Sequence, residues 1–389
     1  MKIISVVGAR PNFMKIAPFC RAIDAWNQSG QGEKIKHVLV HTGQHYDVRM
    51  SDSFFVDLGI PAPDVHLNIG SGTHAEQVGR TMIEFEKVVQ AERPDWVVVV
   101  GDVNATCACS ITAKKEHVKL AHIEAGLRSG DIDMPEEVNR LVTDRLSDLL
   151  LTPDRISNAN LKAEGVTDER IVFVGNIMID TLEAQRDKAA ARSLADVVSQ
   201  NLLDGFTQPS VALRDGHFGV MTMHRPSNVD QRATLEPLMR FLTEEVAVDM
   251  PLLWPIHPRA RKQLETFGLW DKVCQTPQLI LLKPLGYHDM LRLNMGAKVM
   301  LTDSGGLQEE CCVLGTPCLT LRWNTERPVT LREHGGASML VGNEVKKIRA
   351  AYQEVLASTR MPQRPELWDG HTAERIVQAL VKKSRNRQN

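Results

Sequence analysis

Short runs of β-branched and other apolar residues alternate along the chain with longer stretches of helical character. This alternation predicts repeated strand–helix–strand units. Several of the short runs are apolar throughout instead of at every second position, which is typical of parallel strands covered by helices on both faces. The predicted strands of the first half are Ile3–Val7, His37–His41, Trp96–Gly101, Lys119–Ile123 and Ile171–Val174.

The same pattern starts again in the second half. A polar stretch from Asp187 to Asp215, which we expect to be irregular, separates the two series. A chain of 389 residues exceeds what one hydrophobic core serves comfortably, so two domains are expected. The predicted strands of the second series are Phe218–Met221, Leu252–Pro255, Leu279–Leu282, Lys298–Leu301, Cys318–Leu321 and Met339–Val341.

Two such series predict an α/β chain with two Rossmann-like, doubly wound domains facing a cleft. Ligands of such domains bind at the carboxyl ends of the strands. We expect an N-terminal domain over residues 1–185 and a second domain over residues 186–370. Residues 371–389 should form a C-terminal helix, frayed from Lys382 onward, that packs back on the N-terminal domain.

The composition is that of an ordinary globular protein, with 43% hydrophobic and 24% charged residues. The formal net charge of -2 provides no basic field, so nucleic acid is not an expected partner. The apolar runs are far shorter than the roughly 20 residues that span a bilayer, so we expect no membrane partner and a cytoplasmic location.

Cysteine and histidine spacings predict neither a disulfide framework nor a metal centre. The seven cysteines are scattered without a Cys-x-x-Cys pair, so reduced buried thiols are expected. His41 and His45 lie four residues apart, but the Thr-Gly-Gln between them predicts a loop, and no nearby ligand completes a zinc set. We therefore expect no bound metal.

The segment Gly8–Lys15 carries the first candidate chemistry. A strand turns through glycine into a helix that carries Arg10 and Lys15 near its start. Two cations and free backbone N–H groups at a helix N-terminus suit a phosphate. The segment is not a Gly-x-Gly-x-x-Gly loop, so a nicotinamide cofactor is not indicated. The alternative is a tight turn with two solvated cations.

Acidic residues gather at one predicted rim of the first sheet. Asp102 follows one strand, Glu124 follows the next, and Glu136 comes soon after. A carboxylate at the end of a buried strand is costly unless it is paired or functional, and neighbouring carboxylates raise one another's pKa toward acid/base use. The alternative is that Asp102, Glu136 and Glu137 cap helices, but for the set together we favour function.

Residues 301–310 have the form strand, glycine turn, helix. Ser304 and the N–H groups of Gly305 and Gly306 would cradle a diphosphate at the start of the helix, because glycine allows a close approach of the backbone. One turn further, Glu310 could accept two ribose hydroxyls. A Ser-Gly-Gly turn alone is a weak signal, since many helices begin with one.

Two further side chains follow predicted strands of the second half. His224 comes after the strand that begins at Phe218, and Arg322 lies at the end of the strand Cys318–Leu321. The guanidinium of Arg322 would be a bidentate phosphate donor.

Taken in order, these segments resemble the non-hydrolysing UDP-N-acetylglucosamine 2-epimerases over nearly the whole chain. The similarity rests on Gly-x-Arg-Pro-x-x-x-Lys, Gly-Asp, His-Ile-Glu-Ala-Gly-Leu-Arg-Ser, Met-Pro-Glu-Glu-x-Asn-Arg, His-Arg and Thr-Asp-Ser-Gly-Gly-x-Gln-Glu-Glu. Each motif alone is weak, but their order and spacing together are specific. The resemblance implies a GT-B-like arrangement, UDP held mostly by the C-terminal domain, no metal, no nicotinamide and a homodimer.

The implied reaction inverts carbon 2 of UDP-N-acetylglucosamine. UDP leaves by anti elimination with loss of the proton on carbon 2, which gives a 2-acetamidoglucal, and UDP adds again after reprotonation from the other face. This chemistry needs a base, an acid and stabilisation of a cationic ring, which agrees with the cluster of carboxylates.

The resemblance implies a role for each matching residue, while the carboxylate that acts as the base on each face stays open. An alternative for Glu124 is a contact to ribose or sugar hydroxyls. By motif, the catalytic set is Asp102, Glu124, Glu136 and His224, and the substrate is held by Arg10, Lys15, Arg140, Leu285, Met290, Ser304, Gly305, Gly306, Glu310 and Arg322.

The chain departs from the family pattern at two places. After His-Arg the commonest family form continues Arg-Glu-Asn, where this chain has Pro226, Ser227 and Asn228. The uracil pocket of the family often has Gln and Phe where Leu285 and Met290 stand. Because uracil contacts are partly to the backbone, selectivity for UDP could survive.

Several rival functions stay open. A relative acting on a modified sugar such as UDP-2,3-diacetamido-glucuronic acid is the nearest, because His41–Asp47 and Gly72–His74 are reminiscent of that branch. A hydrolysing epimerase would release free sugar. A GT-B glycosyltransferase would need an acceptor, and three carboxylates at the donor carbon argue against it. A non-catalytic UDP-sugar sensor would usually have lost its acid/base residues.

Overall fold

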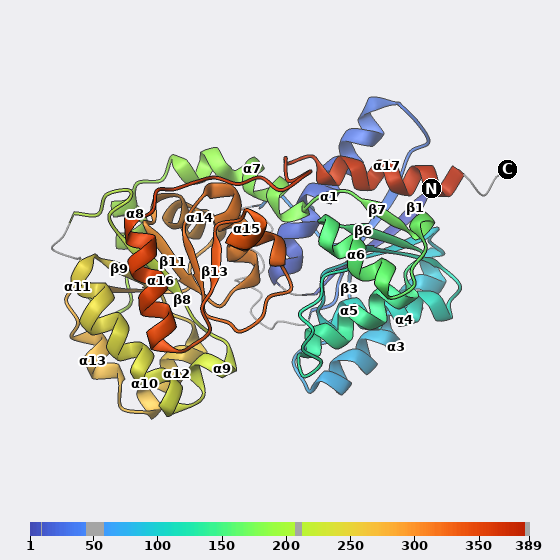
Figure 1. Cartoon of the computed structure of the whole chain (residues 1–389). Helices are drawn as coiled ribbons and strands as arrows, with labels where there is room; N and C mark the ends of the chain where they lie inside the picture. The colour runs from blue at the N-terminus through green and yellow to red at the C-terminus, as the bar shows by residue number, and fades with distance from the viewer. Residues whose placement is uncertain (9, 44–57, 207–211, 386–389) are drawn as a thin grey trace. The chain divides into compact units, whose positions relative to one another are not determined.

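Each half of the chain is built around a parallel sheet, which confirms the predicted α/β class. The computed structural model describes residues 1–8, 10–43, 58–206 and 212–385; the side chains of Arg10 and Pro11 lie outside this part. The chain divides into unit 1, Met1–Ala184 with Pro365–Asn389, and unit 2, Gln185–Arg364 (Figure 1). Among the described residues, no helix is long and apolar enough to cross a membrane.

The sheet of unit 1 has the described strand order β3-β2-β1-β4-β5-β6-β7, with every pair parallel. Ile4 and Val6 of β1 pack with Val97 and Val99 of β4 against helices on one face, and the intervening strand residues are buried as well. The fully apolar strands therefore follow from burial on both faces. The strands are β1 Lys2–Val7, β2 Lys36–His41, β3 Val65–His66, β4 Trp96–Val100, β5 Lys119–Ile123, β6 Leu149–Thr152 and β7 Ile171–Phe173.

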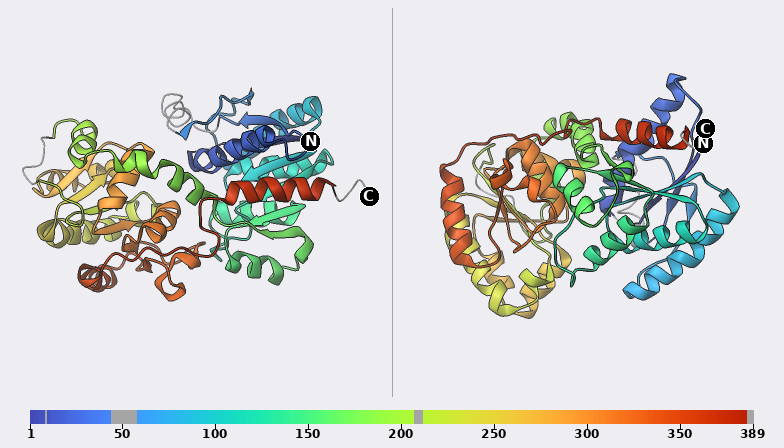
Figure 2. Two further views of the ribbon diagram at one scale, coloured as in Figure 1. Left: turned by 90° about the horizontal axis from the view of Figure 1, so that it is seen from above. Right: turned by 45° about the vertical axis from the view of Figure 1, so that its right-hand side comes forward.

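Helices α3, α4 and α5 pack side by side in unit 1, and α1 packs against α17 (Figures 1 and 2). Thr73 and Glu76 form a capping box at the start of α3. The helices are α1 Arg10–Ser29, α3 His74–Glu92, α4 Asn104–Lys115, α5 Pro135–Leu146, α6 Arg155–Ala163, η1 Asp168–Arg170, α7 Ile177–Ala190, which runs across the boundary between the units, and α17 Thr372–Arg385.

Unit 2 repeats this topology, with the described order β10-β9-β8-β11-β12-β13 and parallel pairs throughout. Alternate residues of its strands, such as Met221 and Val220, belong to separate hydrophobic clusters on the two faces. The strands are β8 Gly219–Thr222, β9 Leu252–Pro255, β10 Leu279–Leu282, β11 Val299–Thr302, β12 Cys318–Thr320 and β13 Ser338–Leu340.

The helices of unit 2 cover both faces of its sheet, α10 and α16 with one cluster and α8 and α14 with the other. Their bounds are α8 Leu194–Asn201, α9 Pro226–Val229, α10 Arg232–Phe241, the π-helix η2 Leu242–Val246, α11 Ala247–Asp249, α12 Pro258–Thr266, α13 Trp270–Cys274, α14 Tyr287–Gly296, α15 Gly305–Leu314, η3 Pro328–Thr330, η4 Arg332–His334 and α16 Val345–Ala357.

Both sheets have a topological switch point. In unit 1 the second and third strands lie on one side of β1 and β4 lies on the other; in unit 2, β8 and β11 stand in the same relation. Doubly wound sheets bind ligands where the carboxyl ends of such a strand pair diverge. The loops after β1, β4, β8 and β11 are therefore where a ligand of each unit is expected.

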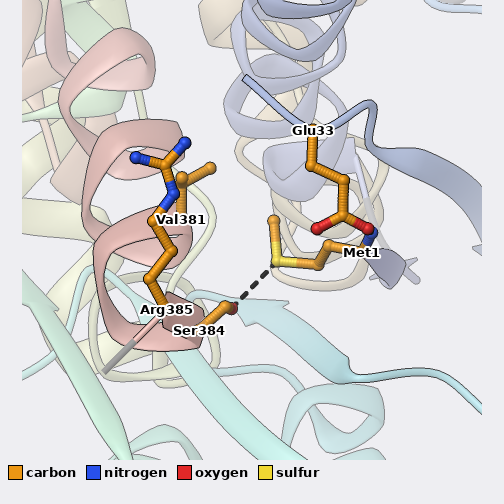
Figure 3. A pocket seen from close by; sticks show the side chains of 5 residues that line it. All are labelled: Met1, Glu33, Val381, Ser384 and Arg385. Carbon is orange, nitrogen blue, oxygen red and sulfur yellow. Dashed lines mark hydrogen bonds and ion pairs between the residues drawn. The ribbon is translucent and has the colours of Figure 1, made fainter. Parts of the chain in front are cut away.

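The C-terminal segment completes unit 1. Trp368 donates its indole N–H to the carbonyl of Pro153 at 2.9 Å, so residues 365–370 belong to this unit and not to unit 2. Asp180 accepts the backbone N–H groups at the start of α17, including that of Ala373 at 2.7 Å. Figure 3 shows Met1 beside Ser384 of α17, whose hydroxyl lies 3.0 Å from the sulfur of Met1.

Two expectations about irregular backbone were wrong. The stretch 187–215 contains the end of α7 and the whole of α8, which Ser193 caps and whose Leu194 and Val197 are buried. The C-terminal helix is not frayed from Lys382 but continues to Arg385, because packed contacts hold its last turn. The strands β3 and β6 were not predicted from the sequence.

The docking of the C-terminal segment can be tested at a pair of left-handed glycines. Gly165→Ala, in open space, should lower the free energy of unfolding by about 1 kcal/mol from backbone strain. At Gly175 an added Cβ would also overlap the carbonyl of Leu367, so Gly175→Ala should cost about 1 to 3 kcal/mol more. Urea unfolding of both variants measures the difference, and equal losses would show that residue 367 does not pack there.

Candidate active site

A buried ion pair lies at the carboxyl edge of the unit 1 sheet. Lys15 of α1 donates to Glu124, which directly follows β5, and their side chains are only 6% and 3% exposed. Glu124 has a φ of 76°, a left-handed conformation that is rare for a residue with a side chain and is concentrated at functional sites. In the structure, the ammonium group of Lys15 is thus paired with the carboxylate of Glu124.

Asp102 stands beside this pair, after β4. The preceding Gly101 has a φ of 69°, and a Cβ there would lie 3.1 Å from Lys15 Nζ and 3.4 Å from Glu124 Oε2. Arg140 of α5 donates to Asp102 Oδ2 at 2.5 Å and is itself 3% exposed, whereas the Asp102 side chain is 22% exposed. Arg140 therefore binds Asp102 from the buried side, and part of the Asp102 side chain stays accessible to solvent.

The neighbouring acids of the first turn of α5 lie in different environments. Glu137 is buried and accepts hydrogen bonds from the backbone of Ser129 and Gly130, each at 3.0 Å, and from Arg140 at 2.6 Å. Burial alone would raise the pKa of Glu137, but these hydrogen bonds outweigh it and hold the pKa below its ordinary value. Glu136 is exposed, so of the two acids it is the one accessible to a ligand.

In unit 2, Asp303 fixes His224. Asp303 follows β11 and is fully buried, and its Oδ1 lies 2.8 Å from Nδ1 of His224. Its Oδ2 accepts the backbone N–H groups of His224 and Arg225 at 2.9 and 2.8 Å. Burial would raise the pKa of Asp303, but the contacts with His224 and these N–H groups lower it. A carboxylate behind a half-exposed imidazole is the arrangement of an oriented acid/base histidine.

The start of α15 has the features of an anion site. Ser304 is the N-cap but its side chain makes no capping hydrogen bond, and the first turn carries no acid. A Cβ at Gly305 would lie 2.6 Å from Arg327 Nη1 and 2.7 Å from Glu326 Oε1, so a side chain at this position would have to displace these two groups. Gly306 is half-buried in the same turn. Uncapped N–H groups and the helix dipole favour a phosphate here.

The other nucleotide candidates are more enclosed. Arg322 is 3% exposed and donates to Glu326 at 2.7 Å, within a network in which Arg327 also pairs with Glu309 at 2.7 Å. Glu310 is buried on α15 beside Tyr287 and Asn294 of α14. Leu285 and Met290 pack into the hydrophobic cluster on the same side of the sheet.

Some predicted positions lie outside the described residues, among them the side chain of Arg10, His45 and the remainder of the segment 44–47. His41 lies inside them, where its Nδ1 accepts the N–H of Gly43 at 3.0 Å. Within the described ranges, no group of three or more His, Cys, Asp or Glu side chains could hold a metal ion.

Sequence reasoning missed the residues that hold the site together. Asp303 was noted only as part of its motif and no role was predicted for it. Its place directly after a buried strand is nevertheless the same signal that identified Asp102. Asn139 was also missed; it donates to the carbonyl of Asp102 at 2.8 Å. No local signal marks it, because 37 residues separate the two partners.

Burial of Glu310 generates a prediction about stability. Desolvation raises its pKa from 4.5 to about 7, so between these values the folded protein holds a proton that the unfolded chain has lost. The free energy of unfolding should therefore fall as the pH rises through this window, by up to about 3 kcal/mol. Urea titrations at pH 5 and 8 should show this loss in the wild type but not in Glu310→Gln. The exposed control Glu86→Gln should behave as the wild type; an equal loss in Glu310→Gln would contradict the assignment.

A family model and several known proteins match this chain. The family model described as UDP-N-acetylglucosamine 2-epimerase matches residues 28–381. The UDP-N-acetylglucosamine 2-epimerase of Methanocaldococcus jannaschii is 40% identical over 98% of this chain and 99% of its own. The UDP-2,3-diacetamido-2,3-dideoxy-D-glucuronate 2-epimerase of Pseudomonas aeruginosa is 38% identical over 98% of this chain and 100% of its own.

A solved structure is similar as well. The crystal structure of the Methanocaldococcus jannaschii enzyme in complex with UDP-GlcNAc and UDP has a TM-score of 0.86 at 38% identity, and the match covers 98% of this chain and 100% of that chain. Sheet topology, motif order and near-complete coverage thus point to one family. The chain belongs to the UDP-N-acetylglucosamine 2-epimerase family.

Proposed function

We propose that this protein is a non-hydrolysing epimerase that converts UDP-N-acetylglucosamine to UDP-N-acetylmannosamine by eliminating UDP and adding it again. The observation that carries the proposal is the set of carboxylates at the carboxyl edge of unit 1, with Asp102 and Glu124 at the ends of adjacent strands and Glu136 on α5. The names of the similar proteins support it. A homodimer working in the cytoplasm without metal or nicotinamide is part of the proposal.

The chemistry divides between the units. Inversion at carbon 2 needs a base on one face and an acid on the other, which Asp102, Glu124 and Glu136 can supply. Elimination leaves negative charge on UDP, and the N–H groups of the first turn of α15, which no side chain caps, can stabilise it. We assign the sugar to unit 1 and the nucleotide to unit 2, where His224 can move a proton or stabilise charge.

A modified UDP-acetamido sugar is the second candidate substrate. The Pseudomonas aeruginosa relative, named for a diacetamido-glucuronate sugar, is almost as similar as the Methanocaldococcus jannaschii relative, at 38% against 40% identity. Initial rates with the two sugar nucleotides, measured side by side, separate these candidates.

The reaction itself is tested in heavy water. Incubation with UDP-N-acetylglucosamine alone should give UDP-N-acetylmannosamine with deuterium at carbon 2, because the original proton is lost to a protein carboxylate that exchanges with solvent. Proton NMR follows both products and label. Full retention of the original hydrogen would contradict the mechanism, and free N-acetylmannosamine would identify a hydrolysing enzyme.

Asp303 provides a test within unit 2. Asp303→Asn keeps the size of the side chain but removes the charge behind His224, so turnover should fall by about 100-fold or more. The matched control Asp230→Asn loses a surface contact to Arg259 and should keep its turnover within about twofold. Steady-state kinetics check both, and unchanged turnover in Asp303→Asn would remove the Asp303–His224 pair from the mechanism.

A further inference from the structure

His122, on β5, is completely buried and lies between two hydrogen-bond acceptors. Its Nδ1 is 2.6 Å from Asp144 Oδ1 of α5, and its Nε2 is 2.8 Å from the carbonyl oxygen of Gly101. The other oxygen of Asp144 accepts the N–H of Gly126 at 3.0 Å and Arg128 Nη1 at 2.7 Å. The proposed mechanism uses none of these contacts directly.

The partners of His122 place a proton on its Nε2. A carbonyl oxygen can only accept, so Nε2 carries a proton. Burial would raise the pKa of Asp144, but His122 and Arg128 outweigh it and hold that pKa below its ordinary value. Asp144 thus holds the ring at Nδ1, while the N–H group on Nε2 donates to the carbonyl of Gly101.

The ring of His122 joins three segments, and each of them carries or leads into an acid of the site. Its bond to Gly101 fixes the peptide that leads into Asp102. Its own strand, β5, leads into Glu124 two residues later, and its contact with Asp144 holds α5, whose first turn carries Glu136. A shift of about 1 Å in a reacting group can cost about 100-fold in rate, so this junction matters for turnover.

We propose that His122, paired with Asp144, is a positioning residue that holds the carboxylates of unit 1 in register through the carbonyl of Gly101. The proposal rests on the proposed epimerisation. It assigns His122 no contact with the substrate.

Two substitutions of His122 distinguish its bond to Gly101 from its bond to Asp144, because each should preserve only one of them. The amide of His122→Gln can reach the position of Nε2 and keep the bond to Gly101, whereas the shorter His122→Asn can reach only the position of Nδ1 and keep Asp144. His37, half-buried on β2 with its Nε2 2.6 Å from the hydroxyl oxygen of Ser5, provides the control His37→Asn.

The kinetic test uses UDP-N-acetylglucosamine in heavy water. We expect His122→Asn to lose about 100-fold in kcat with KM within about threefold, and His122→Gln to lose less than about 10-fold. The ratio of deuterium in recovered substrate to deuterium in product should shift in His122→Asn and stay constant in His37→Asn. This ratio is set within each turnover by how the folded enzyme divides the intermediate between substrate and product. A smaller folded fraction lowers the rate but does not change the ratio.

A second measurement does not depend on activity. Nitrogen NMR of the histidine-labelled full chain, with the His122 signal identified by its loss in His122→Gln, should show that Nε2 carries a proton at pH 7, because it donates to the carbonyl of Gly101. An unprotonated Nε2 in the wild type would overturn the proposal.

The kinetic outcomes are also decisive. Equal kcat and an unchanged label ratio in His122→Asn and the wild type would overturn the positioning role while the epimerase function stands. A wild-type enzyme that epimerises no UDP-acetamido sugar would instead remove the proposed function.

Discussion

The site depends on one electrostatic constraint: a carboxylate that is buried at the edge of a sheet must be paired with a cation or with hydrogen-bond donors. Lys15 compensates Glu124, Arg140 compensates Glu137, and Asp303 is compensated by His224 and backbone N–H groups. Removing one partner of a buried pair typically costs about 3 to 5 kcal/mol. These buried pairs therefore fix the backbone of the loops. The same loops carry the accessible acids, so the buried pairs also fix the positions of those acids.

The repeated topology gives one chain two sheet edges that carry different functional groups. Each sheet has a switch point where loops from neighbouring strands end together, and unit 1 fills this position with acids whereas unit 2 fills it with N–H donors and an oriented histidine. Carboxylates suit proton transfer at a sugar carbon, and helix N-terminal donors suit a diphosphate leaving group. Helix α5 connects the accessible acids of unit 1 with the buried pairs that support them. Glu136 of this helix is accessible, whereas Arg140 and Asp144 of the same helix make buried contacts.

Most of the fold could be predicted because parallel strands buried on both faces are apolar throughout. Strand β6 was missed because Leu149–Thr152 directly follows α5 and leucine favours helices as well. The acids Asp102 and Glu124 were predicted from their places after strands. The pairing of Lys15 with Glu124 was not, because 109 residues separate them and only the folded sheet brings them together. The roles of the individual carboxylates stay predictions.

The central claim is that the bond between the sugar and UDP breaks and forms again during each inversion. Positional isotope exchange tests it most directly, with UDP-N-acetylglucosamine carrying oxygen-18 in the bridge between carbon 1 and the β-phosphate. Departure of UDP frees the β-phosphate to rotate, so the label should move into its non-bridging positions at a rate comparable with epimerisation. Inversion at carbon 2 with the label confined to the bridge would contradict the account.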